Sequence, residues 1–125
     1  MTTRLRLNNM VFYGYHGIYS AEKELGQRIE VDVELVSDFV NVGKTDDFEL
    51  SINYVDVYTI VKEIVEESEF NLIEAIGVAV VDQILDSFDI EQVTVRVRKP
   101  QPPVGGLLDS AEFEMTKNRD DKLVV

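Results

Sequence analysis

The chain has 125 residues, the length of one domain, and 45% of them are hydrophobic, which is enough for a core and argues against global disorder. It carries 24 Asp and Glu against 12 Lys and Arg, a formal net charge of −12. That charge would repel the phosphates of nucleic acids and of anionic membranes, so we expect neither as a partner. With no cysteine and a single histidine, disulfides, a cysteine nucleophile and a cysteine- or histidine-rich zinc site are excluded, and we expect no metal.

No apolar stretch approaches the ~18–20 residues that a membrane span needs. The first residues, Met1–Arg4, lead directly into a strand-like pattern and show no signal peptide. We therefore expect a soluble protein of the cytoplasm.

The first part of the chain predicts two strands with a long connection. Leu5 and Leu7 alternate with arginines and lead into residues 11–13, which predicts the first strand. Gly14 and Gly17 interrupt this pattern, so residues 14–26 are predicted to form a loop. Residues 29–35 alternate between apolar and acidic side chains, which predicts a half-buried second strand, and residues 43–47 predict a polar loop.

The period then changes to that of helices. Apolar residues from Val57 to Val65 recur at helical spacing, with Asn53 as the expected N-cap of a helix that begins at Tyr54. A second helix is predicted after Asn71, and its Gly77, which costs ~1 kcal/mol relative to Ala, suggests close packing. Two more strands are predicted at 93–97 and 111–115, separated by a stiff loop that contains Pro102 and Pro103.

The order of elements, ββααββ, predicts an α+β fold: an antiparallel four-stranded sheet with two helices on one face. We expect one domain over residues 1–117 and a charged C-terminal tail over 118–125 that frays, although Leu123–Val125 could pack on the domain. Both edges of such a sheet stay open unless another subunit pairs with them, so we expect an oligomer that closes a larger β-barrel.

Two residues stand out as candidates for chemistry. Lys99 has the parity of Val93, Val95 and Val97, so it lies at the rim of the buried face; it is either a base whose burial favours the neutral amine or a lysine that extends to solvent at a strand end. Glu74 follows Asn71 by three residues, and this spacing favours a capping box over a carboxylate that grips a ligand.

Three further residues have plain structural interpretations. His16 is expected to be a hydrogen-bonding residue of a loop, Glu22 a solvated loop charge, and Tyr54 an aromatic residue that packs on the sheet at a helix start.

Five blocks of the sequence resemble the dihydroneopterin aldolase family. In chain order they are Phe12–Gly17 with Ser20–Glu22 and Gly26-Gln27, Asn53-Tyr54, Asn71–Glu74, Lys99-Pro100 with Pro102-Pro103, and Asp109-Ser110. They run from about residue 4 to residue 116. One departure is the segment Gly106-Leu107-Leu108-Asp109, where many members have a histidine and an aromatic residue before the aspartate.

The resemblance implies a tunnelling fold, in which four subunits close a barrel and two barrels stack into an octamer with the sites between neighbouring subunits. It implies a retro-aldol cleavage of 7,8-dihydroneopterin in folate synthesis, without a metal or another cofactor, and often an epimerisation to dihydromonapterin as well. By resemblance Lys99 is the base, Glu22 holds the side-chain hydroxyls, and Glu74 and the Ile73 backbone hold the pterin. Tyr54 of a neighbouring subunit would help to protonate the intermediate, and His16 would shape the loop under Glu22.

Two alternatives remain beside this hypothesis. A dihydroneopterin triphosphate epimerase shares the fold and the site, but a triphosphate needs cations and the sequence shows no extra basic cluster near the matched residues. A non-catalytic pterin- or purine-binding module would keep Glu74 and could lose Lys99 and Tyr54, and both are present.

Overall fold

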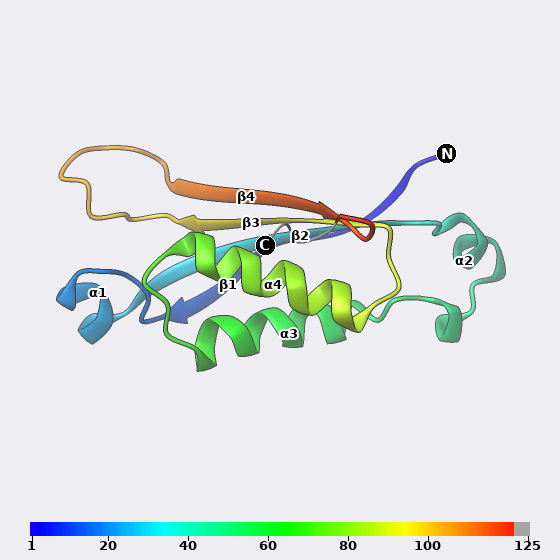
Figure 1. Cartoon of the computed structure of the whole chain (residues 1–125), viewed down its shortest axis with the longest axis horizontal. Coiled ribbons are helices and arrows are strands. Elements are labelled where there is room, and N and C mark those ends of the chain that lie inside the picture. Colours follow the sequence, from blue (N-terminus) through cyan, green and yellow to red (C-terminus); the bar gives the residue numbers. More distant parts are fainter. Residues whose placement is uncertain (122–125) are drawn as a thin grey trace.

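The structure is a computed structural model that describes residues 1–121. It has one antiparallel sheet in the order β1-β2-β3-β4, covered on one face by two long helices (Figure 1). The strands are β1 (Thr3–Gly14), β2 (Gln27–Ser37), β3 (Gln92–Lys99) and β4 (Ala111–Asn118), and the long helices are α3 (Tyr54–Glu67) and α4 (Ile73–Ser87). This arrangement confirms the predicted α+β architecture.

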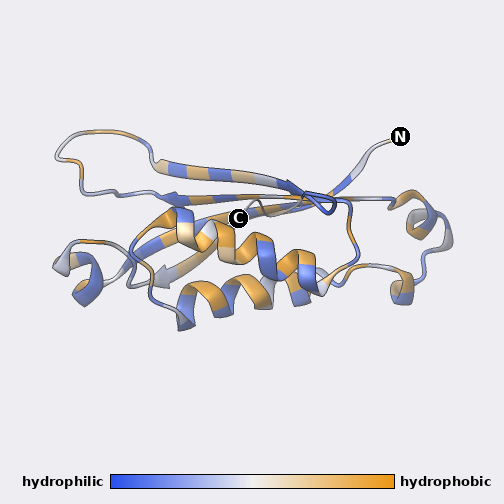
Figure 2. Ribbon diagram, in the orientation of Figure 1, coloured by the Kyte–Doolittle hydropathy of each residue, from blue (hydrophilic) through white to orange (hydrophobic). Residues whose placement is uncertain are grey.

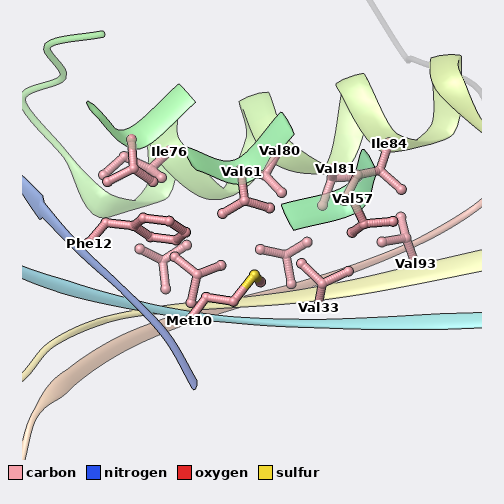
Figure 3. Packing of buried hydrophobic residues seen from close by; sticks show 14 of the residues in the cluster. Met10, Phe12, Val33, Val57, Val61, Ile76, Val80, Val81, Ile84 and Val93 are labelled. Atoms are coloured by element: carbon pink, nitrogen blue, oxygen red, sulfur yellow. The ribbon is translucent and has the colours of Figure 1, made fainter. Parts of the chain in front are cut away.

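The core lies between the sheet and these two helices. Each helix turns an apolar stripe toward the sheet, because a spacing of three or four residues keeps side chains on one face (Figure 2). Full burial of one such side chain contributes about 1.5–3 kcal/mol, so this single layer provides much of the driving force for folding. Figure 3 shows the side chains interlocking across it; the core includes Met10, Phe12, Val31, Val33, Val57, Val61, Val65, Ile76, Val80, Ile84, Val93, Val95 and Val97.

Gly77 allows α4 to lie close to the sheet. A Cβ atom at this position would come within 2.6 Å of two ring carbons of Phe113 on β4. Such an approach is closer than real carbon contacts, so a side chain would force the helix or the ring to shift. The close packing that the sequence predicted at Gly77 is therefore present.

A β-bulge in β1 changes which residues face the core. Up to Leu7 the odd-numbered residues point inward, and from Met10 the even-numbered ones do, with the register shift between these two residues. Asn9 takes up the extra length with a φ of 53°, and its N–H donates to Asp32 at 2.6 Å. Hydrogen bonds from Arg98 are the main cause of a lowered pKa of Asp32, and Arg98 also donates to the Asn9 side chain at 2.9 Å.

Three short helices lie within or next to the segments that were predicted to be loops. The predicted loop 14–26 contains α1 (Ser20–Leu25), and the segment around the predicted loop 43–47 contains α2 (Val40–Thr45) and the 3₁₀ turn η1 (Phe48–Leu50). These pieces have three to six residues, which is less than two turns of helix. Hydrophobic periodicity needs a longer window, so the sequence pattern could not reveal them.

The chain stays attached to the domain beyond residue 117. Strand β4 continues through Asn118. The Arg119 guanidinium donates to the carbonyl oxygens of Leu85 in the last turn of α4 and of Phe88 and Ile90 just after it. The part of the predicted tail from residue 122, including Leu123–Val125, lies outside the described residues. Within residues 1–121 no helix combines the length and the apolar composition that crossing a bilayer would require.

Candidate active site

A cavity of about 290 Å³ lies at one end of the molecule. Its walls come from α1, the start of α4, the end of β3 and the β3–β4 connection, of which α1 and that connection project from the same end of the sheet (Figure 1). Four of the six predicted site residues line it: Glu22, Ile73, Glu74 and Lys99. Apolar side chains, among them Ile18 and Val104, complete the wall.

Lys99 and Glu22 form an ion pair at the centre of this end. The Lys99 Nζ lies 2.6 Å from Glu22 Oε2, and the side chains are only 12% and 9% exposed. Lys99 has the inward parity that the strand predicted, and its ammonium group is paired with a carboxylate. The interpretation of Glu22 as a solvated loop charge was wrong, because α1 turns its side chain toward β3.

Several groups keep Glu22 ionised. Burial raises the pKa of Glu22, but hydrogen bonds from Lys99 and Gln27 oppose burial, and the net effect is a pKa below the usual value. Gln27 Nε2 donates to Glu22 Oε2 at 2.8 Å and to the backbone carbonyl of His16 at 2.6 Å. A buried carboxylate with two such donors is a charge-assisted and well-oriented acceptor.

Gly17 makes room for the Glu22 carboxylate. Its φ is 145°, a value that residues with a side chain rarely adopt, and a Cβ would lie 2.3 Å from Glu22 Oε1. A side chain at position 17 would therefore displace Glu22 from Lys99.

His16 is fully buried and links three segments. Its Nε2 lies 2.7 Å from the carbonyl oxygen of Val65 in the last turn of α3, and its Nδ1 accepts the backbone N–H of Phe70 at 3.0 Å. One nitrogen faces an acceptor and the other a donor, so the imidazole is neutral with its proton on Nε2. The next residue strengthens the link, because Gly17 N–H donates to the Phe70 carbonyl at 2.9 Å.

Glu74 is exposed at the start of α4, and it is not a helix cap. The N-cap residue is Leu72, and no side chain caps this helix. Asn71, the predicted cap, instead accepts a hydrogen bond from Lys23 of α1 at 2.9 Å. The capping-box interpretation of Glu74 was therefore wrong, and its carboxylate stands at the cavity beside the first N–H groups of the helix.

Tyr54 lies outside this cavity. It is 62% exposed at the beginning of α3, whereas His16 contacts Val65 near the other end of that helix. Eleven residues at 1.5 Å each separate these two points by about 16 Å. The expected N-cap at Asn53 is present, with its side chain accepting from Val55 N–H at 2.9 Å. The expected packing of Tyr54 on the sheet is absent, and it is Tyr58 whose ring lies 5.4 Å from that of Phe12.

Gln27 and Lys23 were not recognised as site residues from the residue patterns. Gln27 was noted only within the block Gly26-Gln27, and no periodicity marks Lys23. Their contacts join segments far apart in the sequence, because Lys23 reaches Asn71 across 48 positions. Such pairings depend on the fold and leave no local signal.

Fold and site together define a class: a small two-layer α+β protein whose cavity contains a lysine paired with a carboxylate and a second, exposed carboxylate. Within residues 1–121 no three acidic or histidine side chains come together as metal ligands would.

Comparison with known proteins identifies the family within this class. The family model of dihydroneopterin aldolase matches residues 5–116. Dihydroneopterin aldolase of Bacillus subtilis (strain 168) is 38% identical over 117 residues, covering 93% of this chain and 98% of that protein. The enzyme of that name from Staphylococcus epidermidis is 36% identical, covering 91% and 95% of the two chains. The chain therefore belongs to the dihydroneopterin aldolase family.

Solved structures agree with this at the level of the fold. Escherichia coli dihydroneopterin aldolase in complex with neopterin superimposes with a TM-score of 0.85 at 21% identity, covering 93% of this chain and 99% of that one. Dihydroneopterin aldolase from Burkholderia thailendensis bound to guanine gives a TM-score of 0.78 at 22% identity, covering 95% and 93%. The fold is thus the tunnelling fold of this family.

Acid should destabilise the protein through His16. Burial is the main cause that lowers the pKa of His16 below its usual 6.5, so the unfolded chain binds a proton that the folded protein does not. The stability that the neutral, buried His16 gives the folded protein is fully present above pH ~6.5. It is lost as the pH falls from there toward the lower pKa of His16 in the folded state. The free energy of unfolding, measured by urea denaturation, should therefore decrease between pH 7.5 and 5.5. His16→Gln should be less stable at pH 7.5 but should lose less stability over this range, whereas an equal loss in the variant would contradict the assignment.

Proposed function

We propose that this protein is a dihydroneopterin aldolase of folate biosynthesis, an aldehyde-lyase that converts 7,8-dihydroneopterin into 6-hydroxymethyl-7,8-dihydropterin and glycolaldehyde. Family membership supports the activity. The observation that carries the site assignment is that Lys99, Glu22 and Glu74 meet in one cavity. Neopterin and guanine in the two structural neighbours support a flat, amide-bearing heterocycle as the ligand. We propose that the enzyme acts in the cytoplasm.

The substrate supplies its own electron sink. Breaking the bond between the first and second side-chain carbons leaves an electron pair on the first carbon, and the adjacent C=N group of the dihydropterin ring accepts it. What remains for the enzyme is to remove a proton from the hydroxyl of the second carbon as the bond breaks, and to return a proton to the enamine afterwards. Side chains that bind and move protons are sufficient for these steps.

Lys99 and Glu22 are the groups that would handle the first proton. In this proposal the substrate hydroxyls bind Glu22 and compete for its carboxylate, which weakens the hold on the Lys99 ammonium. Lys99 then loses its proton to solvent and, as the neutral amine, accepts the hydroxyl proton through a bound water. The ion pair at 2.6 Å supports this role, because it places both groups against the same part of a ligand.

Glu74 and Ile73 would hold the pterin. The Glu74 carboxylate accepts hydrogen bonds from the amino group and a ring N–H, and the Ile73 backbone lies beside the ring. His16 contributes by holding the loop between β1 and α1. The same cavity argues against the triphosphate epimerase alternative. A triphosphate needs several cations, and Lys99 is the only basic side chain among the described residues that line the cavity.

The direct test is to incubate the purified protein with 7,8-dihydroneopterin and to separate the pterins by chromatography. We expect 6-hydroxymethyl-7,8-dihydropterin and glycolaldehyde in equal amounts, with dihydromonapterin as a possible second product of epimerisation. Turnover of the triphosphate alone would favour the epimerase, and binding without turnover would favour a non-catalytic module.

We further propose a homo-oligomer, with subunits closing a β-barrel and barrels stacking into an octamer. Two observations support it: β1 and β4 are open sheet edges, and Tyr54, the proposed proton donor to the intermediate, is exposed far from the cavity of its own chain.

If the site is shared, inactive variants should complement each other. Tyr54→Phe and Lys99→Ala subunits, co-expressed and purified together, should form some sites with both wild-type residues and regain turnover that neither variant has alone. Light scattering should show an octamer or at least a tetramer. A fully active monomer, or the absence of complementation in a mixed oligomer, would contradict a shared site.

Glu74→Ala should weaken pterin binding at least tenfold, because each charge-assisted hydrogen bond contributes roughly 1.5–3 kcal/mol. The melting temperature should change little, since no side chain caps α4. Titration calorimetry with the product measures the affinity, and Glu91→Ala, which removes another exposed acid, is the control. Unchanged affinity in Glu74→Ala would remove Glu74 from the binding site.

Lys99→Ala should reduce kcat by about 10²–10⁴-fold, the usual contribution of a general base, with a smaller effect on product affinity. Lys99→Arg should not restore it, because guanidinium stays protonated at neutral pH. Borohydride added with substrate should leave no covalent adduct on Lys99 by mass spectrometry, because the pterin ring and not a Schiff base takes the electrons. An adduct would overturn the chemistry, and normal turnover in both variants would overturn the residue assignment.

A further inference from the structure

Gln27 shares its hydrogen-bond acceptors with Lys99 at the proposed site. It is the first residue of β2, pairs with Gly14 across the β1–β2 ladder, and is partly buried. Its side-chain nitrogen donates to Glu22 Oε2 at 2.8 Å and to the His16 carbonyl at 2.6 Å. Both partners are acceptors only, so the amide must present its NH₂ group to them and cannot be reversed.

Lys99 reaches the same two acceptors. Its Nζ is 2.6 Å from Glu22 Oε2 and 3.5 Å from the His16 carbonyl. Two donors and two acceptors thus form a closed arrangement in which each donor faces both acceptors. The uncharged donor, Gln27, holds the carboxylate from β2, and the charged donor, Lys99, holds it from the neighbouring strand β3.

We infer that Gln27 is a positioning residue for the proposed reaction: its amide holds the Glu22 carboxylate in the orientation that meets both Lys99 and the substrate hydroxyls. This inference rests on the proposed function for its catalytic consequence, whereas its effect on Glu22 is independent of turnover.

The surroundings of Glu22 explain why one neutral donor matters. Gly17 closes the side of Oε1, leaving no space for a side chain there. Both ring nitrogens of His16 are bonded elsewhere, to Val65 and Phe70. Among residues 1–121 the one basic side chain bonded to Glu22 is Lys99. Lys23 on α1 binds Asn71, and Arg28 on β2 pairs with Glu30. Without Gln27, the carboxylate would keep only the flexible lysine and a backbone hydrogen bond from Tyr19 among the described residues, and it would lose its bond to the start of β2.

The loss of this hydrogen bond should change the titration of Glu22. The amide favours the ionised carboxylate, and its removal raises the pKa of Glu22 because a donor to the charged form is lost. The acid limb of the kcat/KM profile, which reports groups of the free enzyme, should therefore move to higher pH. A role of Gln27 limited to strand pairing would lower stability without this shift.

The test compares Gln27→Met, which keeps the length but removes both donors, with Gln27→Glu, which adds a second negative charge. In Gln27→Met we expect kcat to fall about tenfold or more and the acid limb of the kcat/KM profile to move to higher pH. The affinity for a pterin that lacks the hydroxylated side chain should stay within about twofold of the wild-type value. Gln27→Glu should move the Glu22 titration further in the same direction. The matched control is Gln92→Met on β3, whose amide binds Asn118 at the opposite end of the sheet and which should leave the profile unchanged.

Carbon-13 NMR titration of the Glu22 carboxyl separates this inference from the proposed function. A raised pKa of Glu22 in both Gln27 variants supports the positioning role even if the wild-type protein does not cleave dihydroneopterin, in which case the proposed function alone fails. An unchanged Glu22 titration, or wild-type kcat with an unmoved acid limb in Gln27→Met, overturns the inference.

Discussion

The arrangement of the site depends on one buried imidazole. His16 donates to the end of α3 and accepts from the connection before α4, so the loop after β1 is bound to α3 and to the segment that leads into α4. Its backbone carbonyl in turn receives Gln27 and faces Lys99. Neither an aliphatic residue nor a charged one can make both side-chain bonds, because the site requires a donor and an acceptor on one rigid ring. These hydrogen bonds hold the loop in place relative to the helix and the sheet.

The side chains of the candidate site come from the core layers and from the short helix α1. Lys99 ends a strand and Glu74 begins a helix, so both are carried by the layers that form the core. Gln27 is the first residue of β2, a strand of the same sheet, and Glu22 comes from the short helix α1, which follows the loop that His16 holds. Geometry of this kind keeps a buried charge pair satisfied while the cavity itself stays open to a ligand. The chain is strongly acidic overall. The cavity nevertheless contains the positively charged side chain of Lys99, which is buried beside the carboxylate of Glu22.

The sequence predicted those features that depend on regular periodicity. Lys99 could be placed on the inner face because β3 alternates without interruption. Glu74 was misjudged, since residue spacing does not show whether Asn71 or Leu72 precedes the helix. The burial of Glu22 was missed on residue patterns because it requires a six-residue helix, a glycine at φ 145° and a strand 77 positions away to come together. Long-range packing of that kind is a property of the folded chain and has no counterpart in a local pattern.

The bulge in β1 also determines where this strand can change its length. On either side of Asn8-Asn9 the residues are locked in alternation, so an insertion or deletion elsewhere in the strand would turn an apolar side chain such as Phe12 toward solvent. At the bulge, one residue already lies outside the pairing and is held by Asp32 and Arg98 on the polar face. Gaps between this chain and its relatives within residues 3–14 should therefore fall at this point, which keeps the spacing from the bulge to His16 constant.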